Sequence, residues 1–219
     1  MSYNKPLSYS SISLFKQCPR RWAWTYIDGN REPPGPAAMR GTLIHQMLED
    51  YFRGSPYPLG DSTLAPWAKY MEALLGQALE PECKLAVLDD WTPTDFDDPK
   101  ALARGAADGR LFETFDGTLY IYDWKSGREY DTHEAQGKMY MAMDWAVWER
   151  CIVRFVYLDN PLIVRDWTWF PADRDETREQ LAEQIHIVRH ATEYPETPGD
   201  HCNWCPLSWR KGGTCKRAR

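Results

Sequence analysis

Hydrophobic residues recur along this chain with two spacings, one helical and one alternating. Apolar residues three and four apart predict amphipathic helices, which cover residues 10–27, 38–53, 63–80, 132–148 and 173–192. Alternating apolar and polar residues predict strands, which cover residues 82–88, 104–115, 118–125, 151–158 and 162–169. The pattern therefore predicts a chain that mixes helices and strands from end to end.

Prolines, glycines and short polar runs indicate where these elements bend or end. Pro19 should kink the first helix just after Cys18, and the run 33–36, Pro-Pro-Gly-Pro, should form a loop. Asp116-Gly117 should form a tight hairpin turn, because both residues can adopt positive φ. Further loops are expected over 89–100 and 159–161. The second helix is expected to bury Leu43, Ile44, Met47, Leu48, Tyr51 and Phe52.

Size and charge limit the classes of protein to which the chain can belong. With 219 residues it is long enough for one elaborated domain over 1–219. A net charge of -6 argues against a protein that coats nucleic acid through bulk positive potential. The last ten residues nevertheless hold five basic and no acidic residues, and they form either a local basic patch or a solvated tail. No apolar run suits a bilayer and residues 1–5 show no signal peptide, so we expect a cytoplasmic protein without a membrane partner.

The predicted hairpin brings chemical groups together. Pairing the strands around Asp116-Gly117 places Asp108 roughly opposite Asp123, and Lys125 shares a face with Asp123 because side chains alternate along a strand. Carboxylates this close repel each other unless a cation lies between them, and hard oxygen ligands suit Mg²⁺ or Mn²⁺. A protonated lysine cannot be a ligand, so Lys125 is better placed to orient an attacking water or to stabilise charge on a phosphate.

These residues resemble a known family. Asp108 followed by Asp123-Trp124-Lys125 resembles the PD-(D/E)xK nuclease core, and Asp-Trp-Lys-Ser-Gly is similar to its RecB-type branch. The resemblance implies an α/β fold of the restriction-endonuclease-like class, with a mixed central sheet flanked by helices and a catalytic core over 38–170. It also implies that His45 joins the metal shell with Asp108, Asp123 and the backbone carbonyl of Trp124.

Other positions match the same branch. Gln136 and Tyr140 lie four apart on one predicted helix face, and they resemble the Gln-x3-Tyr pair that looks toward the DNA and the active site. Glu82 loosely matches an acidic position before the metal-binding strands, although a solvent-facing strand charge would explain it equally well. Glu49, one turn after His45, is a candidate for positioning a neighbouring basic residue.

The six cysteines fall into two groups. Cys83 and Cys151 lie in apolar runs and are expected in the core, whereas Cys202, Cys205 and Cys215 follow one another near the end of the chain. Together with Cys18, these three resemble the iron–sulfur ligands of AddB nucleases and Cas-four-type exonucleases. The resemblance implies a [4Fe–4S] cluster that joins residues 1–30 to residues 195–219.

Two features leave the identity of the metal at this cysteine site open. Nine residues separate Cys205 from Cys215, which is longer than the family pattern. Zinc fits the same four thiolates, and His201 could replace one of them.

The order of these motifs favours a metal-dependent DNA exonuclease that acts on single-stranded DNA or on DNA ends. Arg20, Arg21, Arg210 and Lys211, near the expected cluster, would follow the DNA backbone. The alternative is a non-catalytic DNA-binding or adaptor module of the same fold with zinc at the cysteine site. Candidate partners are proteins of recombination, repair, phage replication or CRISPR adaptation, and the sequence does not predict the oligomeric state.

Overall fold

A five-stranded sheet runs through the protein in the order β1-β2-β3-β4-β5. The structure is a computed structural model that describes residues 3–55, 59, 63–77, 79–159 and 163–215. The strands are β1 (Glu80–Val87), β2 (Ala103–Glu113), β3 (Thr118–Lys125), β4 (Arg150–Tyr157) and β5 (Ile163–Trp169). Neighbouring strands are antiparallel except β3 and β4, which are parallel. The sheet is therefore mixed, as the resemblance implied.

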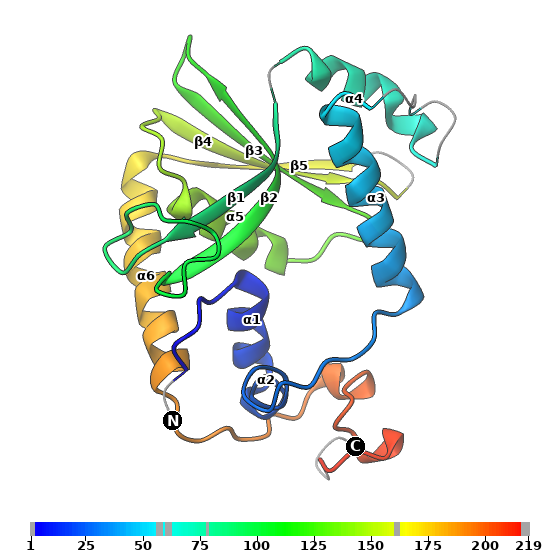
Figure 1. Ribbon diagram of the computed structural model, residues 1–219, viewed down its shortest axis with the longest axis vertical. Helices are drawn as coiled ribbons and strands as arrows, with labels where there is room; N and C mark the ends of the chain where they lie inside the picture. The colour runs from blue at the N-terminus through cyan, green and yellow to red at the C-terminus, as the bar shows by residue number, and fades with distance from the viewer. Residues whose placement is uncertain (1–2, 56–58, 60–62, 78, 160–162, 216–219) are drawn as a thin grey trace.

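Helices pack on both faces of this sheet. They are α1 (Tyr9–Gln17), α2 (Pro19–Tyr26), α3 (Pro36–Phe52), α4 (Ala68–Leu75), α5 (Thr132–Met143) and α6 (Pro171–His190), with short 3₁₀ turns at Ala65–Trp67, Asp200–Asn203 and Trp209–Lys211. In Figure 1, α3 and α4 lie on the right of the sheet, α6 on the left, and α1 and α2 below it. α5 makes the crossover that the parallel pair β3 and β4 requires.

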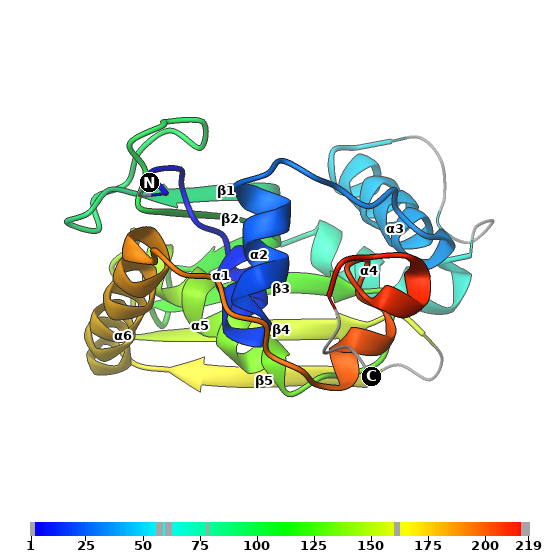
Figure 2. The same cartoon turned by 90° about the horizontal axis from the view of Figure 1, so that it is seen from below.

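Two hydrophobic cores hold these layers together. The first lies between the sheet and α1, α2, α5 and α6, and includes Trp22, Ile121, Met141 and Phe155. The second lies between the sheet and α3 and α4, and includes Leu48, Met71, Tyr122 and Trp124. Successive residues of β3 alternate between the two, as a strand buried on both faces requires. Figure 2 shows the five strands side by side with α1 and α2 in front of them.

The β2–β3 hairpin forms at the predicted place, but its turn spans four residues, 114–117, instead of the two that were predicted, and β2 ends at Glu113. Gly117 has a φ of 66°, and Asp116 Oδ1 accepts a hydrogen bond from the Thr118 backbone N–H at 3.1 Å. A Cβ at position 117 would also lie 2.8 Å from Glu149 Cγ, so both backbone conformation and space favour glycine here.

The first predicted helix is two helices instead of one kinked helix. α1 ends at Gln17 and α2 begins at Pro19, and Cys18 between them has an extended backbone with φ −161° and ψ 102°. A residue before proline is pushed out of the helical region by the proline ring, and proline at the first helical position needs no N–H partner. The prediction placed the interruption correctly at Cys18 and Pro19, but it was wrong to treat residues 10–27 as one kinked helix.

Other predicted elements differ mainly in length. α5 ends at Met143 and not at 148, because Asp144 is extended and its carboxylate accepts from the backbone N–H of Ala146 and from the guanidinium of Arg110. α3 buries Ile44 and Leu48, whereas Leu43 is 61% exposed. The third predicted helix, 63–80, is only the turn at Ala65–Trp67 followed by α4.

Parts of three expectations lie outside the described residues: position 78 of the third predicted helix, positions 160–162 of the turn and strand, and positions 216–219 of the basic tail.

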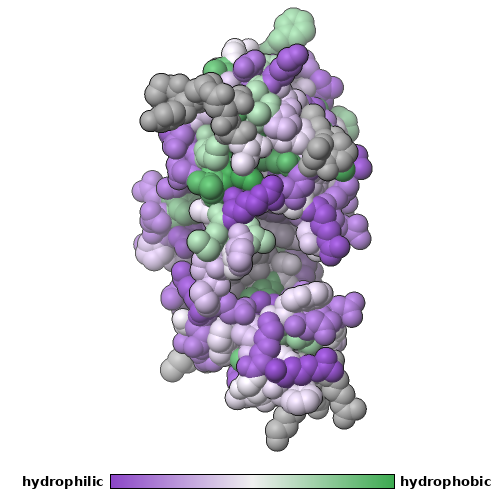
Figure 3. Space-filling view, turned by 90° about the vertical axis from the view of Figure 1, so that its right-hand side faces the viewer, coloured by the Kyte–Doolittle hydropathy of each residue, from purple (hydrophilic) through white to green (hydrophobic). Residues whose placement is uncertain are grey.

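The end of the chain returns to α2. The Arg20 backbone N–H donates to the Pro195 carbonyl at 3.2 Å, and the segment that follows lies beside α2 in both ribbon views (Figures 1 and 2). From the α3 side, the surface is hollowed between the upper part of the molecule and this segment (Figure 3). Within the described ranges, no helix has the length and apolar character needed to cross a membrane.

Candidate active site

Strands β1 and β2 lose their regular pairing at Glu82 and Asp108. The ladder pairs the residues on either side of these two positions but not the two themselves, and Glu82 has a φ of 52°. Cys83 and Ala107 belong to the core beside α5, whereas Leu111 belongs to the core beside α3. Residues four apart on a regular strand would share a face, so the side chains change faces here. A positive φ at a residue other than glycine is strained and is typical of functional sites.

Asp108 and Asp123 face each other across β2 and β3. The register that pairs Gly109 with Tyr122 sets the two aspartates opposite one another, as the hairpin predicted. Asp108 Oδ2 accepts a hydrogen bond from the Trp124 backbone N–H at 2.6 Å. Burial, and then repulsion from Asp123, raise the pKa of Asp108, although His45 opposes this rise. A cation between the two carboxylates would relieve that repulsion.

His45 reaches this site from α3. Its Nδ1 lies 2.7 Å from Asp108 Oδ1. Burial alone would lower the pKa of His45, but the hydrogen bond to Asp108 and the charges of Asp108 and Asp123 outweigh burial and raise that pKa. Gly41, one turn earlier, allows the close approach, because a Cβ there would lie 3.0 Å from Ser126 Oγ after β3.

Glu82 completes a set of three candidate metal ligands. His45, Glu82 and Asp108 each offer a ligand atom, and these atoms all lie within 4.8 Å of one another. Burial and the charge of Glu49 raise the pKa of Glu82, and His45 and Glu82 line a hollow of about 510 Å³ beside α3. One nitrogen and two carboxylate donors fit a small divalent cation such as Mg²⁺ or Mn²⁺.

Asp123 and Lys125 form the second half of the site. Lys125 Nζ lies 2.6 Å from Asp123 Oδ1 and forms an ion pair with it. The angles at this contact do not meet the geometry of a hydrogen bond. The same ammonium donates to Gln136 Oε1 at 3.0 Å, and Gln136 Nε2 donates to Asp123 Oδ2 at 3.1 Å. Gln136 on α5 thus holds both the acid and the amine in place.

Tyr140 adds a second support for Asp123. Its hydroxyl accepts a hydrogen bond from Gln136 Nε2 at 2.8 Å. The same hydroxyl can donate either to Asp123 Oδ2, at 3.1 Å, or to the Ala106 carbonyl, at 2.9 Å. Burial, followed by the charges of Asp123 and Asp108, raises the pKa of Tyr140 well above its ordinary value. Tyr140 therefore stays protonated and acts as a hydrogen-bond donor.

This arrangement of acids, imidazole and lysine can be compared with known proteins. A family model described as the PD-(D/E)XK nuclease superfamily matches residues 6–210. The chain belongs to this superfamily.

Two solved structures resemble this chain over nearly its whole length. The crystal structure of SSO0001 has a TM-score of 0.53 and 16% sequence identity, covering 95% of this chain and 86% of that one. A protein named "putative exonuclease" from Eubacterium rectale has a TM-score of 0.51 and 12% identity, covering 94% of this chain and 88% of that one. At these identities the likeness shows the fold alone. No curated protein matches this sequence.

In this PD-(D/E)XK nuclease, the predicted site residues fall into two regions. The metal and catalytic candidates gather around Asp108: His45, Glu82, Asp123, Lys125, Gln136 and Tyr140. Trp124 contributes its backbone N–H to Asp108, and the metal-ligand role of its carbonyl stays a prediction. Glu49 pairs with Arg53 at 2.9 Å, which agrees with its expected role beside a basic residue.

The predicted DNA-binding residues lie in the other region, near the cysteines. Arg20 lines the cysteine hollow, and Arg21 pairs with Glu32 at 3.1 Å. Arg210 is exposed, and Lys211 Nζ donates to the Trp204 carbonyl at 3.1 Å. Their role in binding DNA stays a prediction.

The four predicted ligand cysteines line one small hollow between the start of α2 and the C-terminal segment: Cys18, Cys202, Cys205 and Cys215. All four are free thiols. They do not form a set of three or more donors within 4.8 Å of one another; among the described residues, only the His45 set meets that spacing. His201 lines the same hollow, and its buried Nε2 has no hydrogen-bond partner. Cys83 and Cys151 are buried in the sheet core, as expected.

A second hollow, beside Gln136 and Tyr140, was not predicted from the sequence. Its lining includes Tyr9, Arg104 and His133. His133 lies one turn before Gln136, and that helical spacing is the signal that could have drawn attention to it.

Proposed function

We propose that this protein is a Mg²⁺- or Mn²⁺-dependent deoxyribonuclease that removes nucleotides from DNA ends, preferably from unpaired strands. The observation that carries the proposal is the set of His45, Glu82 and Asp108 with ligand atoms within 4.8 Å, beside the Asp123–Lys125 pair. Membership in a nuclease superfamily supports cleavage of nucleic acid. The name of the Eubacterium rectale protein supports an exonuclease mode.

The residues of the site divide the work of hydrolysis. A bound divalent cation would lower the pKa of a water and offset charge on the phosphate. His45, Glu82 and Asp108 would hold that cation together with Asp123. Lys125, fixed between Asp123 and Gln136, can hold the attacking water in position and stabilise the growing negative charge on the phosphate oxygens.

We further propose that the four cysteines hold a [4Fe–4S] cluster with a structural role. The four thiols support this proposal because they line one hollow between two distant segments of the chain, and cysteine thiolates are the usual ligands of such clusters. A cluster sulfur would also offer the unpaired His201 Nε2 a hydrogen-bond partner.

Incubation of pure protein with end-labelled single-stranded and duplex DNA tests the nuclease proposal. With Mn²⁺ or Mg²⁺ the wild type should shorten labelled strands, and chelation should stop it. Asp108→Ala should reduce cleavage to background, and Lys125→Ala should reduce it by roughly 10²–10³-fold. Asp175→Ala is the matched control, since that residue is exposed on α6 and lines none of the hollows described above.

The proposal is wrong if wild-type protein with bound metal leaves all these substrates intact, or if Asp108→Ala cleaves as fast as the Asp175→Ala control.

A further inference from the structure

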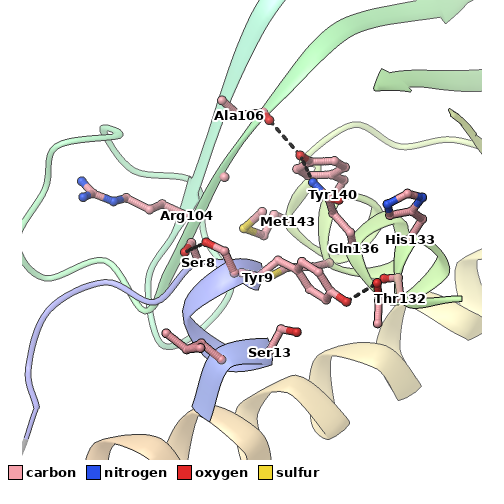
Figure 4. A pocket seen from close by; sticks show the side chains of 14 residues that line it. Ser8, Tyr9, Ser13, Arg104, Ala106, Thr132, His133, Gln136, Tyr140 and Met143 are labelled. Atoms are coloured by element: carbon pink, nitrogen blue, oxygen red, sulfur yellow. Dashed lines mark hydrogen bonds between the residues drawn. The ribbon is translucent and has the colours of Figure 1, made fainter. Parts of the chain in front are cut away.

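A separate hollow of about 480 Å³ adjoins the catalytic network on the α1 side. We call it the end pocket, and it is lined by Ser8, Tyr9 and Ser10 at the start of α1, Arg104 on β2, and His133 and Gln136 on α5. Figure 4 shows Tyr9 crossing from α1 toward α5, with Gln136 and Tyr140 on the other side of the space and the Arg104 side chain extending away from it. Gln136 and Tyr140 therefore contact both the end pocket and Asp123.

The lining of the end pocket combines polar and apolar groups. Ser8 and Ser10 place their hydroxyls 2.9 Å apart at the start of α1, whereas the Arg104 guanidinium points away from the pocket and donates to the Phe96 carbonyl at 3.3 Å. Met139 and Met143 supply apolar surface. Serine hydroxyls can donate to a phosphate, and polarisable methionines suit the face of a base.

His133 is fixed as a flat, neutral part of the wall. Its ring stacks on Phe155 at 5.4 Å with an interplanar angle of 1°, and its Nδ1 lies 2.6 Å from the Tyr157 hydroxyl. Burial, followed by the charge of Lys125, lowers the pKa of His133. A neutral imidazole adds no charge that would compete with a metal near Asp108.

Tyr9 closes the far side of the end pocket. Its hydroxyl donates to the Thr132 carbonyl at 2.6 Å, which ties α1 to the first turn of α5. Beyond this ring lies another hollow of about 500 Å³, which shares Tyr9, Ser13 and Thr132 with the end pocket and is also lined by Lys16 and Lys138. The aromatic ring is thus the partition between two spaces of similar size.

We propose that the end pocket receives the terminal nucleotide of a DNA strand, and that Tyr9 is the wall that stops the strand one nucleotide beyond the scissile bond. This inference rests on the proposed nuclease function and adds the length of its product. Small-molecule pockets measure roughly 300–1,000 Å³, so a hollow of about 480 Å³ suits one nucleotide better than several. In each turnover, water oxygen bonds to phosphorus, the bond to the leaving sugar oxygen breaks, and that oxygen takes up a proton.

The length of the products tests the inference. Wild-type protein should release mononucleotides from a labelled single strand, as resolved by mass spectrometry of early time points. Tyr9→Ala joins the two hollows and should raise the share of dinucleotides and longer products by about tenfold or more. Tyr9→Phe keeps the ring and should keep mononucleotide products. Phe115→Ala, at the fully exposed tip of the hairpin, is the control for loss of an aromatic ring.

A variant that fills the pocket covers the case in which Tyr9→Ala fails to fold. Ser10→Trp places a large ring at an exposed lining position and should raise the KM for DNA by about tenfold or more while leaving the half-saturating Mn²⁺ concentration unchanged.

The outcomes separate this inference from the nuclease proposal. The end-pocket inference alone is wrong if the wild type cleaves DNA but the Tyr9→Ala variant still releases only mononucleotides. It is also wrong if the Ser10→Trp variant keeps the wild-type KM. Wild-type protein that leaves DNA intact overturns the nuclease function, and the end pocket with it.

Discussion

Tyr140→Phe should weaken metal binding at a site that the tyrosine does not itself touch. The substitution removes the hydroxyl that lies 3.1 Å from Asp123 Oδ2, 2.9 Å from the Ala106 carbonyl and 2.8 Å from Gln136 Nε2. Loss of a group that orients a ligand typically reduces metal affinity or activity by about 10–100-fold. Each buried partner left without a hydrogen bond costs about 1–3 kcal/mol, so the free energy of unfolding should fall by a similar amount.

Two measurements on the same protein check this prediction. Cleavage rates over a Mn²⁺ titration give the half-saturating concentration, and denaturant unfolding without metal gives the stability. Tyr194→Phe is the matched control, because it loses a comparable hydroxyl bond to the Ala191 carbonyl at 2.9 Å away from the carboxylates. A Tyr140→Phe protein that loses stability but keeps the wild-type Mn²⁺ dependence would refute the reasoning, since Tyr140 would then be structural only.

Three further changes test other parts of the structure. Glu82→Gly should raise the unfolding free energy by about 1 kcal/mol in denaturant titrations, because a positive φ strains any other residue, while cleavage falls through loss of a ligand. Arg110→Met should lower stability by about 3–5 kcal/mol, because it leaves the fully buried Asp144 carboxylate unpaired. Cys205→Ser should abolish visible absorbance and bound iron, whereas stoichiometric zinc in a colourless wild type would favour the alternative metal.

The local features of the site could be predicted because they depend on short stretches of chain. Asp116-Gly117 marks the position of the hairpin, and the length of the turn determines the register. A two-residue turn would set Asp108 opposite Lys125, whereas the four-residue turn over 114–117 sets Asp108 opposite Asp123. The alternation of side chains then placed Lys125 beside Asp123. These inferences needed no information from residues farther away.

Features that depend on contacts between distant residues could not be predicted in the same way. α5 ends early because Asp144 binds Arg110, 34 positions before it in sequence, and no local pattern marks that pair. Helical spacing identified the buried face of α3 but not its width, so Leu43 was wrongly placed inside. The backbone of Glu82 is irregular because of its place opposite Asp108, and a glutamate in an alternating strand gives no sign of a positive φ.

The irregularity at Glu82 and Asp108 explains how helices on opposite faces serve one site. α3 packs on one core through Ile44 and Leu48, and α5 packs on the other through Met139 and Met141. On a regular sheet, side chains from these two helices would be separated by the sheet itself. Because the side chains of β1 and β2 change faces at this point, one carboxylate can meet an imidazole from α3 while its neighbour meets the amide and hydroxyl of α5. A substitution that restored regular pairing here should therefore separate the metal ligands from the lysine network, even if every catalytic side chain were retained.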